Sequence, residues 1–270
     1  SVGINGISIN NVNVRNGAEW LISERHYKEL EQISHIFAQY GISMYLCIDF
    51  AAPMTLGGLS CADPLKEEVK DWWEKKCGEI FGRLPNMGGF LVKADSEGRP
   101  GPFAYGRNHA DGANMLARAV KPYGGTIIWR CFVYNCQQDW RDRRTDRACA
   151  GYDNFMPLDG KFDDNVILQI KNGPIDFQVR EPVHPLFGGL QHTNQMLEVQ
   201  IAQEYTGQQI DVCYLVPMWK EVLDFSTGCG KPEDTVADII SGRTFGQQRC
   251  GMAAVANTGR DANWTGHDLA

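Results

Sequence analysis

The sequence predicts an α/β fold built on parallel strands, and three observations support this. The chain has 270 residues, close to the length of about 250 that is typical of a single (β/α)₈ barrel. Short apolar runs rich in β-branched residues recur along it and at first alternate with helical patterns, an order that implies parallel strands joined by right-handed crossovers. No strand is followed by the glycine-rich dinucleotide fingerprint, which disfavours an open nucleotide-binding sheet.

Seven segments are predicted as strands because each is short, apolar and bounded by polar or turn-forming residues. They are Ile4–Asn10, Ile42–Asp49, Gly89–Lys93, Thr126–Val133, Val166–Lys171, Leu197–Ile201 and Met252–Ala256. A closed barrel needs eight strands, whereas an open doubly wound sheet accommodates seven. The chain contains no internal repeat or low-complexity linker, so residues 1–270 are expected to form a single domain.

Helical patterns lie between several of these strands. Four are predicted, each from an apolar stripe or from capping residues: Ser23–Tyr40, the segment from Asp63 to Gly82, Asn108–Val120 and Pro232–Ile240. In the first, one helical face carries Tyr27, Leu30, Ile33, Ile36, Phe37 and Tyr40. The polar region from Asn135 to Asp164 is interpreted as a solvated helix and loop, and Val212–Trp219 fits either a strand or a helix.

Composition excludes some functions and leaves others open. A formal net charge of −7 argues against general nucleic-acid binding, which requires a basic surface. No segment approaches the roughly 20 consecutive apolar residues of a membrane helix. The nine cysteines form no CxxC pair, so they indicate reduced thiols and favour a cytoplasmic location, while an extracellular or periplasmic one stays open.

Polar residues follow almost every predicted strand, where a parallel barrel carries its active site. They are Asn10, Asn11, Asp49, Lys93 through Glu97, Arg130, Lys171 through Asp176, Glu204 and Asn257. A single one of these groups is more often a cap or an ion-pair partner than a catalytic residue. Together they indicate an enzyme that acts on a polar substrate.

Three of these residues are carboxylates suited to glycosidic hydrolysis: Glu97, Asp176 and Glu204. That reaction needs one protonated acid for the leaving oxygen and one ionised carboxylate to activate water or to attack. Three cations, Lys93, Arg130 and Lys171, come from the same strand ends. They are either structural partners of the carboxylates or a binding site for an anionic substrate, which an arginine can hold with two parallel hydrogen bonds.

These strand-end segments resemble glycoside hydrolase family 67, the xylan α-glucuronidases. The resemblance extends over essentially the whole chain and is most specific in its long central stretch. The matching segments are Gly3–Asn13, Leu91–Gly98, Lys161–Val166, Gln169–Pro182, Gln203–Tyr205 and Ala254–Gly259.

The resemblance implies a role for each of the six residues. Glu97 is expected to be the general acid, and Asp176 and Glu204 the pair that activates the attacking water. The family inverts configuration, so the acid is expected about 6.5–9.5 Å from the base. Binding of the glucuronate carboxylate is assigned to Lys93 and Arg130, with Lys171 nearby. No metal or organic cofactor is implied, in line with the absence of metal-ligand spacing.

The family's enzymes are longer than this chain. The resemblance therefore implies a catalytic-barrel fragment that lacks the first strand and the last helix, with an exposed sheet edge. Family members dimerise through C-terminal parts, so this chain alone is expected to be a monomer. Two departures from the family pattern are Asp95, where Asn is usual, and His184, which replaces a small residue and is expected to pack in its loop.

The leading hypothesis is inverting hydrolysis of the α-1,2 bond between (4-O-methyl-)glucuronic acid and xylose, with a glucuronic-acid-substituted xylo-oligosaccharide as substrate. One alternative is a barrel glycosidase for a neutral sugar, which has no need for the three cations to converge. The other is a non-catalytic carbohydrate-binding barrel, which would use aromatic platforms. Three tryptophans could provide these, although core packing is the favoured role for each: Trp129, Trp219 and Trp264.

Overall fold

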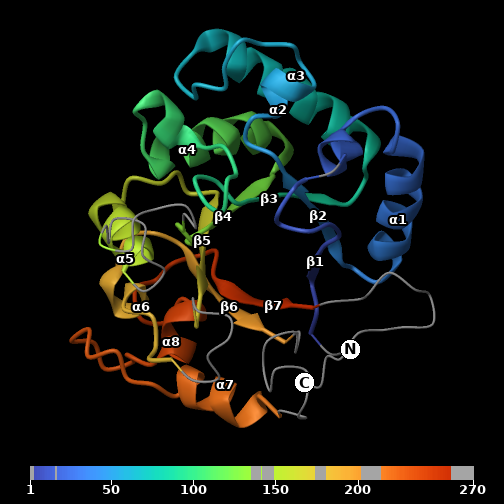
Figure 1. The fold of residues 1–270 in the computed structure, drawn as a ribbon. Coiled ribbons are helices and arrows are strands. Elements are labelled where there is room, and N and C mark those ends of the chain that lie inside the picture. Colours follow the sequence, from blue (N-terminus) through green and yellow to red (C-terminus); the bar gives the residue numbers. More distant parts are fainter. Residues whose placement is uncertain are drawn as a thin grey trace. The chain divides into compact units, whose positions relative to one another are not determined.

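The computed structural model describes residues 3–15, 17–134, 141, 149–173, 181–201 and 214–256. It divides into two compact units, residues 1–138 with 161–166, and residues 139–160 with 167–270. Each unit winds parallel strands in sequence order, with helices in the connections (Figure 1). The predicted α/β fold of the (β/α)₈-barrel type is confirmed, and the described residues contain seven strands where a complete barrel has eight. That residues 1–270 form a single domain stays a prediction.

Four parallel strands form the sheet of the first unit: β1 Gly6–Ser8, β2 Ser43–Ile48, β3 Met87–Val92 and β4 Thr126–Arg130. Strands β3 and β4 approach closely at Gly89, whose φ is 144°. A Cβ atom at Gly89 would lie 1.8 Å from the Thr126 carbonyl oxygen, so this position requires glycine. Further along, Val92 lies beside Trp129, which places the ends of the two strands side by side.

The three long helices of this unit were all predicted: α1 Tyr27–Gln39, α3 Glu67–Arg83 and α4 His109–Val120. Helix α4 begins with a capping box, in which Asn108 accepts a hydrogen bond from the Asp111 amide and Asp111 accepts one from the Asn108 amide, both 3.0 Å long. The apolar face of α1 is buried only in part, because Ile36 is 54% exposed and Tyr40, directly after the helix, is 75% exposed. The shorter elements are η1 Ala18–Ile22, α2 Ala52–Thr55, η2 Pro102–Tyr105 and η3 Lys121–Tyr123.

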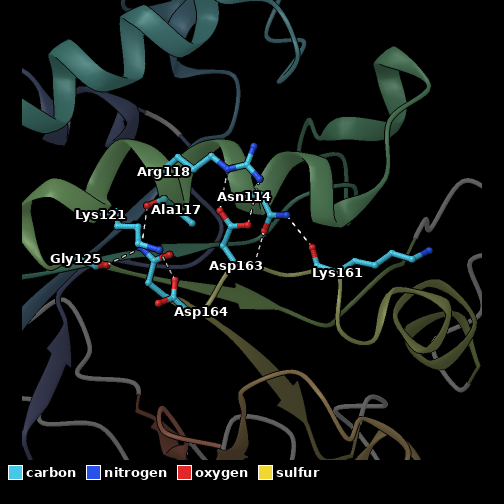
Figure 2. A network of polar contacts seen from close by, with 9 residues as sticks. Asn114, Ala117, Arg118, Lys121, Gly125, Lys161, Asp163 and Asp164 are labelled. Atoms are coloured by element: carbon cyan, nitrogen blue, oxygen red, sulfur yellow. Dashed lines mark hydrogen bonds and ion pairs between the residues drawn. The ribbon is translucent and has the colours of Figure 1, made fainter.

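A polar network at the N-terminal end of β4 attaches residues 161–165 to α4 and η3 (Figure 2). Asn165 is 2% exposed, and its side-chain amide donates to the carbonyl oxygens of Ala117 (2.8 Å) and Gly125 (3.0 Å). Around it, Arg118 makes a two-pronged ion pair with Asp163. The network thereby fixes where the chain enters β5 Val166–Lys171.

Strands β5, β6 Gln195–Gln200 and β7 Gly251–Val255 lie parallel and in this order, with nearly all of β5 and the whole of β6 and β7 in the second unit. Its helices are α5 Ala150–Phe155, η4 Met156–Leu158, α6 Leu186–Gly189, α7 Val216–Leu223 and α8 Val236–Ile240. The ambiguous segment Val212–Trp219 is therefore helical from Val216 onward. Helix α8 opens with a capping box between Thr235 and Asp238, so it begins after Pro232. No helix in the described ranges is long and apolar enough to span a bilayer.

Candidate active site

Two of the predicted cations occupy adjacent strand ends in the first unit. Lys93 follows the last residue of β3, and Arg130 is the last residue of β4. Since Val92 pairs with Trp129, the next residues along the two strands are Lys93 and Arg130, whose side chains leave the same face of the sheet. Lys93 lies 5.3 Å and Arg130 4.9 Å from the centroid of the Phe132 ring. Both cations are largely buried, at 3% and 8% exposure.

Glu97 lies on a tight turn directly after β3. The Arg99 amide donates to the Ser96 carbonyl oxygen over 2.8 Å, which closes the turn. Asp95 and Glu97 have φ values of 52° and 50°, and among the described residues they are the non-glycine positions with positive φ. This conformation is unfavourable for a glutamate and is found where surrounding contacts impose it. One such contact comes from the Glu97 amide, which donates to the Tyr134 carbonyl oxygen over 2.7 Å.

The side chains of Lys93 and Glu97 form an ion pair inside this turn. The Lys93 side chain is 1% exposed, whereas that of Glu97 is 29% exposed. The Lys93 ammonium also donates to Asn13 Oδ1 over 2.8 Å. The ammonium therefore contacts a carboxylate, an amide oxygen and an aromatic ring, and the carboxylate is more exposed than the ammonium.

The loop after β1 holds the Glu97 turn from a second side. Arg15 donates from its guanidinium to the Glu97 carbonyl oxygen, and Arg99 donates to the carbonyl oxygen of Val14. With the Asn13 contact to Lys93, three consecutive residues of this loop bind the segment that bears the predicted acid. Sequence reasoning did not find these residues, although Asn13 lies in the family-like stretch Gly3–Asn13.

Asp95 fixes the turn from a third side. Its Oδ2 accepts a hydrogen bond from the Phe103 amide over 3.1 Å, at the start of η2. A Cβ atom at Gly101 would lie 2.3 Å from the Asp95 Cγ, so the carboxyl group fills the space that a side chain would need. Burial raises the pKa of Asp95 to about 7, and the Phe103 amide opposes this in part. The carboxyl group is directed at η2, which makes it a support of the turn.

The other strand ends of this unit serve the fold. The Asn10 side chain forms two hydrogen bonds with the Cys47 backbone, 2.9 and 2.7 Å long, and joins the ends of β1 and β2. After β2, Asp49 Oδ1 accepts from the Ala51 amide over 2.9 Å, and burial raises the pKa of the Asp49 carboxyl group. Trp129 is fully buried, with its Nε1 3.2 Å from His109 Nδ1, so its expected core role is confirmed.

In the second unit, Lys171 ends β5 and is paired in register with Glu198 of β6. Glu198 is fully buried and accepts a hydrogen bond from Gln169 Nε2 over 2.6 Å. Sequence reasoning overlooked Glu198, although a carboxylate within an apolar strand, between Leu197 and Val199, is itself a signal of a buried polar site.

His184 packs in its loop, as expected. It is 5% exposed, its Nδ1 accepts a hydrogen bond from the Leu186 amide over 3.2 Å, and burial lowers its pKa to about 4. Asp176 and Glu204, the two predicted water-activating carboxylates, lie outside the described residues, as do Trp264 and Cys213.

The first unit thus brings two buried cations and a carboxylate together at the ends of β3 and β4. Comparison with known proteins identifies the family. The family described as "Glycosyl hydrolase family 67 middle domain" matches residues 1–264. The chain belongs to glycosyl hydrolase family 67.

Curated relatives carry the name α-glucuronidase. The chain is 47% identical over 272 residues to "Alpha-glucuronidase A" of Emericella nidulans and 48% identical over 270 residues to "Probable alpha-glucuronidase A" of Aspergillus fumigatus. It is 47% identical over 270 residues to "Alpha-glucuronidase" of Hypocrea jecorina. Each match covers 100% of this chain, which spans 31–32% of the length of those relatives. The family predicted from the strand-end segments is confirmed.

Proposed function

We propose that this chain carries the acid and the anion-binding part of an α-glucuronidase active site. The reaction is inverting hydrolysis of the α-1,2 bond between (4-O-methyl-)glucuronic acid and xylose in xylan-derived oligosaccharides. The observation that carries the proposal is the arrangement at the ends of β3 and β4. There, two buried cations lie over one aromatic ring, and the ammonium is paired with Glu97. Family membership and the names of the curated relatives support it.

Two cations at one strand end match the charge of a uronic acid. The Arg130 guanidinium can hold the substrate carboxylate with two parallel hydrogen bonds, and Lys93 adds a compact positive charge. In a buried site these contacts are stronger than in water because the local dielectric constant is low. A neutral sugar would leave both cations without a substrate anion, so this arrangement favours glucuronate over the neutral-sugar alternative. Lys171 is proposed as a third donor to the same substrate.

Hydrolysis then needs one proton donor and one base. Glu97 donates its proton to the glycosidic oxygen as the bond from the sugar C1 breaks. A water oxygen bonds to C1 from the opposite face, and Asp176 or Glu204 accepts the proton that this water loses. The products are glucuronic acid, released as the β anomer, and an oligosaccharide with a free xylose 2-hydroxyl. A carbohydrate-binding barrel without catalysis would not require an acid held in a turn with two positive φ values.

The test follows product formation by NMR in the complete polypeptide that carries this chain, with a glucuronic-acid-substituted xylo-oligosaccharide as substrate. We expect the β anomer to appear first. Glu97→Gln should lower kcat by about 10²–10⁴, the range that general acid catalysis contributes. The matched control is Glu68→Gln, which removes a carboxylate that is half exposed on α3 and should leave kcat unchanged. Initial release of the α anomer would overturn inversion, and full turnover in Glu97→Gln would overturn the assignment of the acid.

A further inference from the structure

We propose that the Lys93 ammonium exchanges one carboxylate partner for another during the reaction cycle, and that this exchange places the proton on Glu97. In the first arrangement, Lys93 pairs with Glu97, as in the structure. In the second, the carboxylate of the substrate takes the place of Glu97 at the ammonium, and Glu97 takes up one proton from solvent. The inference rests on the proposed function and deepens it, because it makes substrate binding and loading of the acid a single event.

The burial of Lys93 favours replacement of Glu97 by the substrate carboxylate over binding of the substrate beside Glu97. The Lys93 side chain is 1% exposed, and Glu97, at 29%, is the more exposed member of the pair. Asn13 and the Phe132 ring contact the ammonium as well. Among these contacts, Glu97 is the carboxylate, so the substrate carboxylate is the like-charged group that can take its position at the ammonium. Asn13 and Phe132 carry no charge that the exchange would have to replace.

Charge is the second argument. If the substrate carboxylate entered while Glu97 stayed ionised, two carboxylates would lie against the same ammonium in a site with little water, with Arg130 as the neighbouring cation. The repulsion between two carboxylates this close is relieved when one of them binds a proton, as in paired carboxylates that cannot both ionise. The substrate carboxylate is the stronger acid of the two by its chemistry, because the ring oxygen withdraws electrons from it. Glu97 is therefore the group that becomes neutral, and a neutral Glu97 is the form that general acid catalysis requires.

The charged groups around the pair are compatible with this proton uptake. Arg130 lies over the same Phe132 ring, and its positive charge adds to the attraction for the substrate carboxylate. Arg15 and Arg99 donate to backbone carbonyl oxygens of Glu97 and Val14, so they hold the turn through its backbone. Asp95 is directed away, towards the Phe103 amide. The side chain of Glu97 is thus free to leave Lys93 without dismantling the turn that carries it.

Isothermal titration calorimetry tests the exchange without relying on turnover. Glucuronic acid is titrated into the complete polypeptide in buffers of different ionisation enthalpy, at several pH values, with glucose as the neutral probe. We expect glucuronic acid to bind with uptake of up to one proton, and its affinity to fall by up to about tenfold per pH unit in the window of uptake. Glucose should bind weakly and without this uptake.

Three variants locate the proton. Glu97→Gln keeps the size of the side chain but cannot titrate, so glucuronic acid should bind with no uptake and with an affinity nearly independent of pH. Asp95→Asn should keep the proton uptake, and this result would exclude the neighbouring carboxyl group as the group that receives the proton. Lys93→Met should weaken glucuronic acid binding. It should also abolish the proton uptake, because no ammonium is left from which the substrate could displace Glu97. Thermal unfolding of each variant confirms that it is folded.

The possible outcomes separate the exchange from the proposed function. If glucuronic acid binds no better than glucose, the anionic site and with it the proposed function are overturned. If it binds selectively but uptake is absent, or persists in Glu97→Gln, the exchange is wrong while the function stands. A second measurement is the pH dependence of turnover. The pKa of the alkaline limb in the kcat profile reports the enzyme–substrate complex, and it should be higher than the pKa in the kcat/KM profile, which reports the free enzyme. Coincident limbs would contradict the exchange.

Discussion

The two ends of strand β4 carry two kinds of charge cluster. At its N-terminal end, the network of Figure 2 holds the pairs Arg118–Asp163 and Lys121–Asp164, whose members are 23–72% exposed. At its C-terminal end, Lys93 pairs with Glu97 at 1% and 29% exposure. Exposed pairs contribute about 0–1 kcal/mol each, whereas a buried ammonium costs several kcal/mol of desolvation. The first cluster therefore lies where a charge costs little free energy. The second retains a buried charge that is costly to desolvate, in keeping with the proposed binding of an anionic substrate.

The largest expected effect tests this contrast directly. Lys93→Met should lower kcat/KM for a glucuronic-acid-substituted oligosaccharide by about 10²–10⁴, because a buried charged contact to substrate is worth roughly 3–5 kcal/mol. Its matched control at the other end of β4 is Lys121→Met, which should leave kcat/KM unchanged. Steady-state kinetics on both variants measures the difference. Equal losses in the two variants would remove the distinction between the clusters.

The buried member of the N-terminal network should matter for stability alone. Asn165→Ala removes two hydrogen bonds and leaves the carbonyl oxygens of Ala117 and Gly125 without this donor. We expect a loss of about 2 kcal/mol in the free energy of unfolding, from the cost of unsatisfied buried groups. Urea unfolding measures the loss. Activity per folded molecule should be unchanged, and a changed KM would show that the network reaches the site.

A smaller effect, with a defined pH dependence, is expected at Asp95. Its pKa of about 7 lies above the ordinary value of 3.8, so the folded protein binds the proton more tightly than the unfolded chain. The resulting stabilisation is fully present below pH 3.8 and is lost as pH rises through about 7. Asp95→Asn should therefore be more stable than the original chain at pH 8, by about 1–2 kcal/mol, since partial exposure moderates the cost of burying the ionised group.

Thermal unfolding at pH 4 and pH 8 measures this difference for Asp95. The gain in Asp95→Asn should shrink towards pH 4, because the carboxyl group is then neutral in the original chain as well. A gain of the same size at both pH values would show that the amide is preferred for its hydrogen bonding alone.

The smallest effect should come from the exposed pairs. Lys121→Ala removes the partner of Asp164 and should change the free energy of unfolding by less than about 0.5 kcal/mol, with a still smaller change in high salt. Chemical unfolding at low and high ionic strength measures it. A loss above 1 kcal/mol would mean that the network acts as a cooperative unit.

Sequence patterns predicted the strands well because burial of parallel strands leaves long apolar runs. Strand β5 Val166–Lys171 was predicted to the residue, and β4 begins at the predicted Thr126. The buried faces of helices were harder to predict than the strands. Ile36 and Tyr40 follow the helical period of α1 yet are exposed, because periodicity identifies the apolar face but not how much of it neighbouring elements cover. The location of Val216–Leu223 in a helix depended on tertiary context that an apolar run does not reveal.

The site was predictable where its residues follow strands and unpredictable where it depends on contacts between loops. Lys93, Glu97 and Arg130 were found because polar residues after apolar runs stand out. The contact of Asn13 with Lys93 joins residues 80 positions apart, and no periodicity encodes such a pairing. The positive φ values of Asp95 and Glu97 could not be predicted from the sequence either, because neither residue type by itself indicates that conformation. The roles assigned to all six residues stay predictions, and two of these residues, Asp176 and Glu204, lie outside the described residues.

The Phe132 ring has a consequence for selectivity among anions. Its face lies 5.3 Å from the Lys93 ammonium and 4.9 Å from the Arg130 carbon, so its quadrupole attracts both cations without cancelling their charge. An aromatic ring in this position stabilises two positive groups that lie close together. If they bind the substrate carboxylate as proposed, a carboxylate with its two oxygens should compete for this place better than a spherical anion such as chloride, because a planar carboxylate can form two parallel hydrogen bonds with a guanidinium.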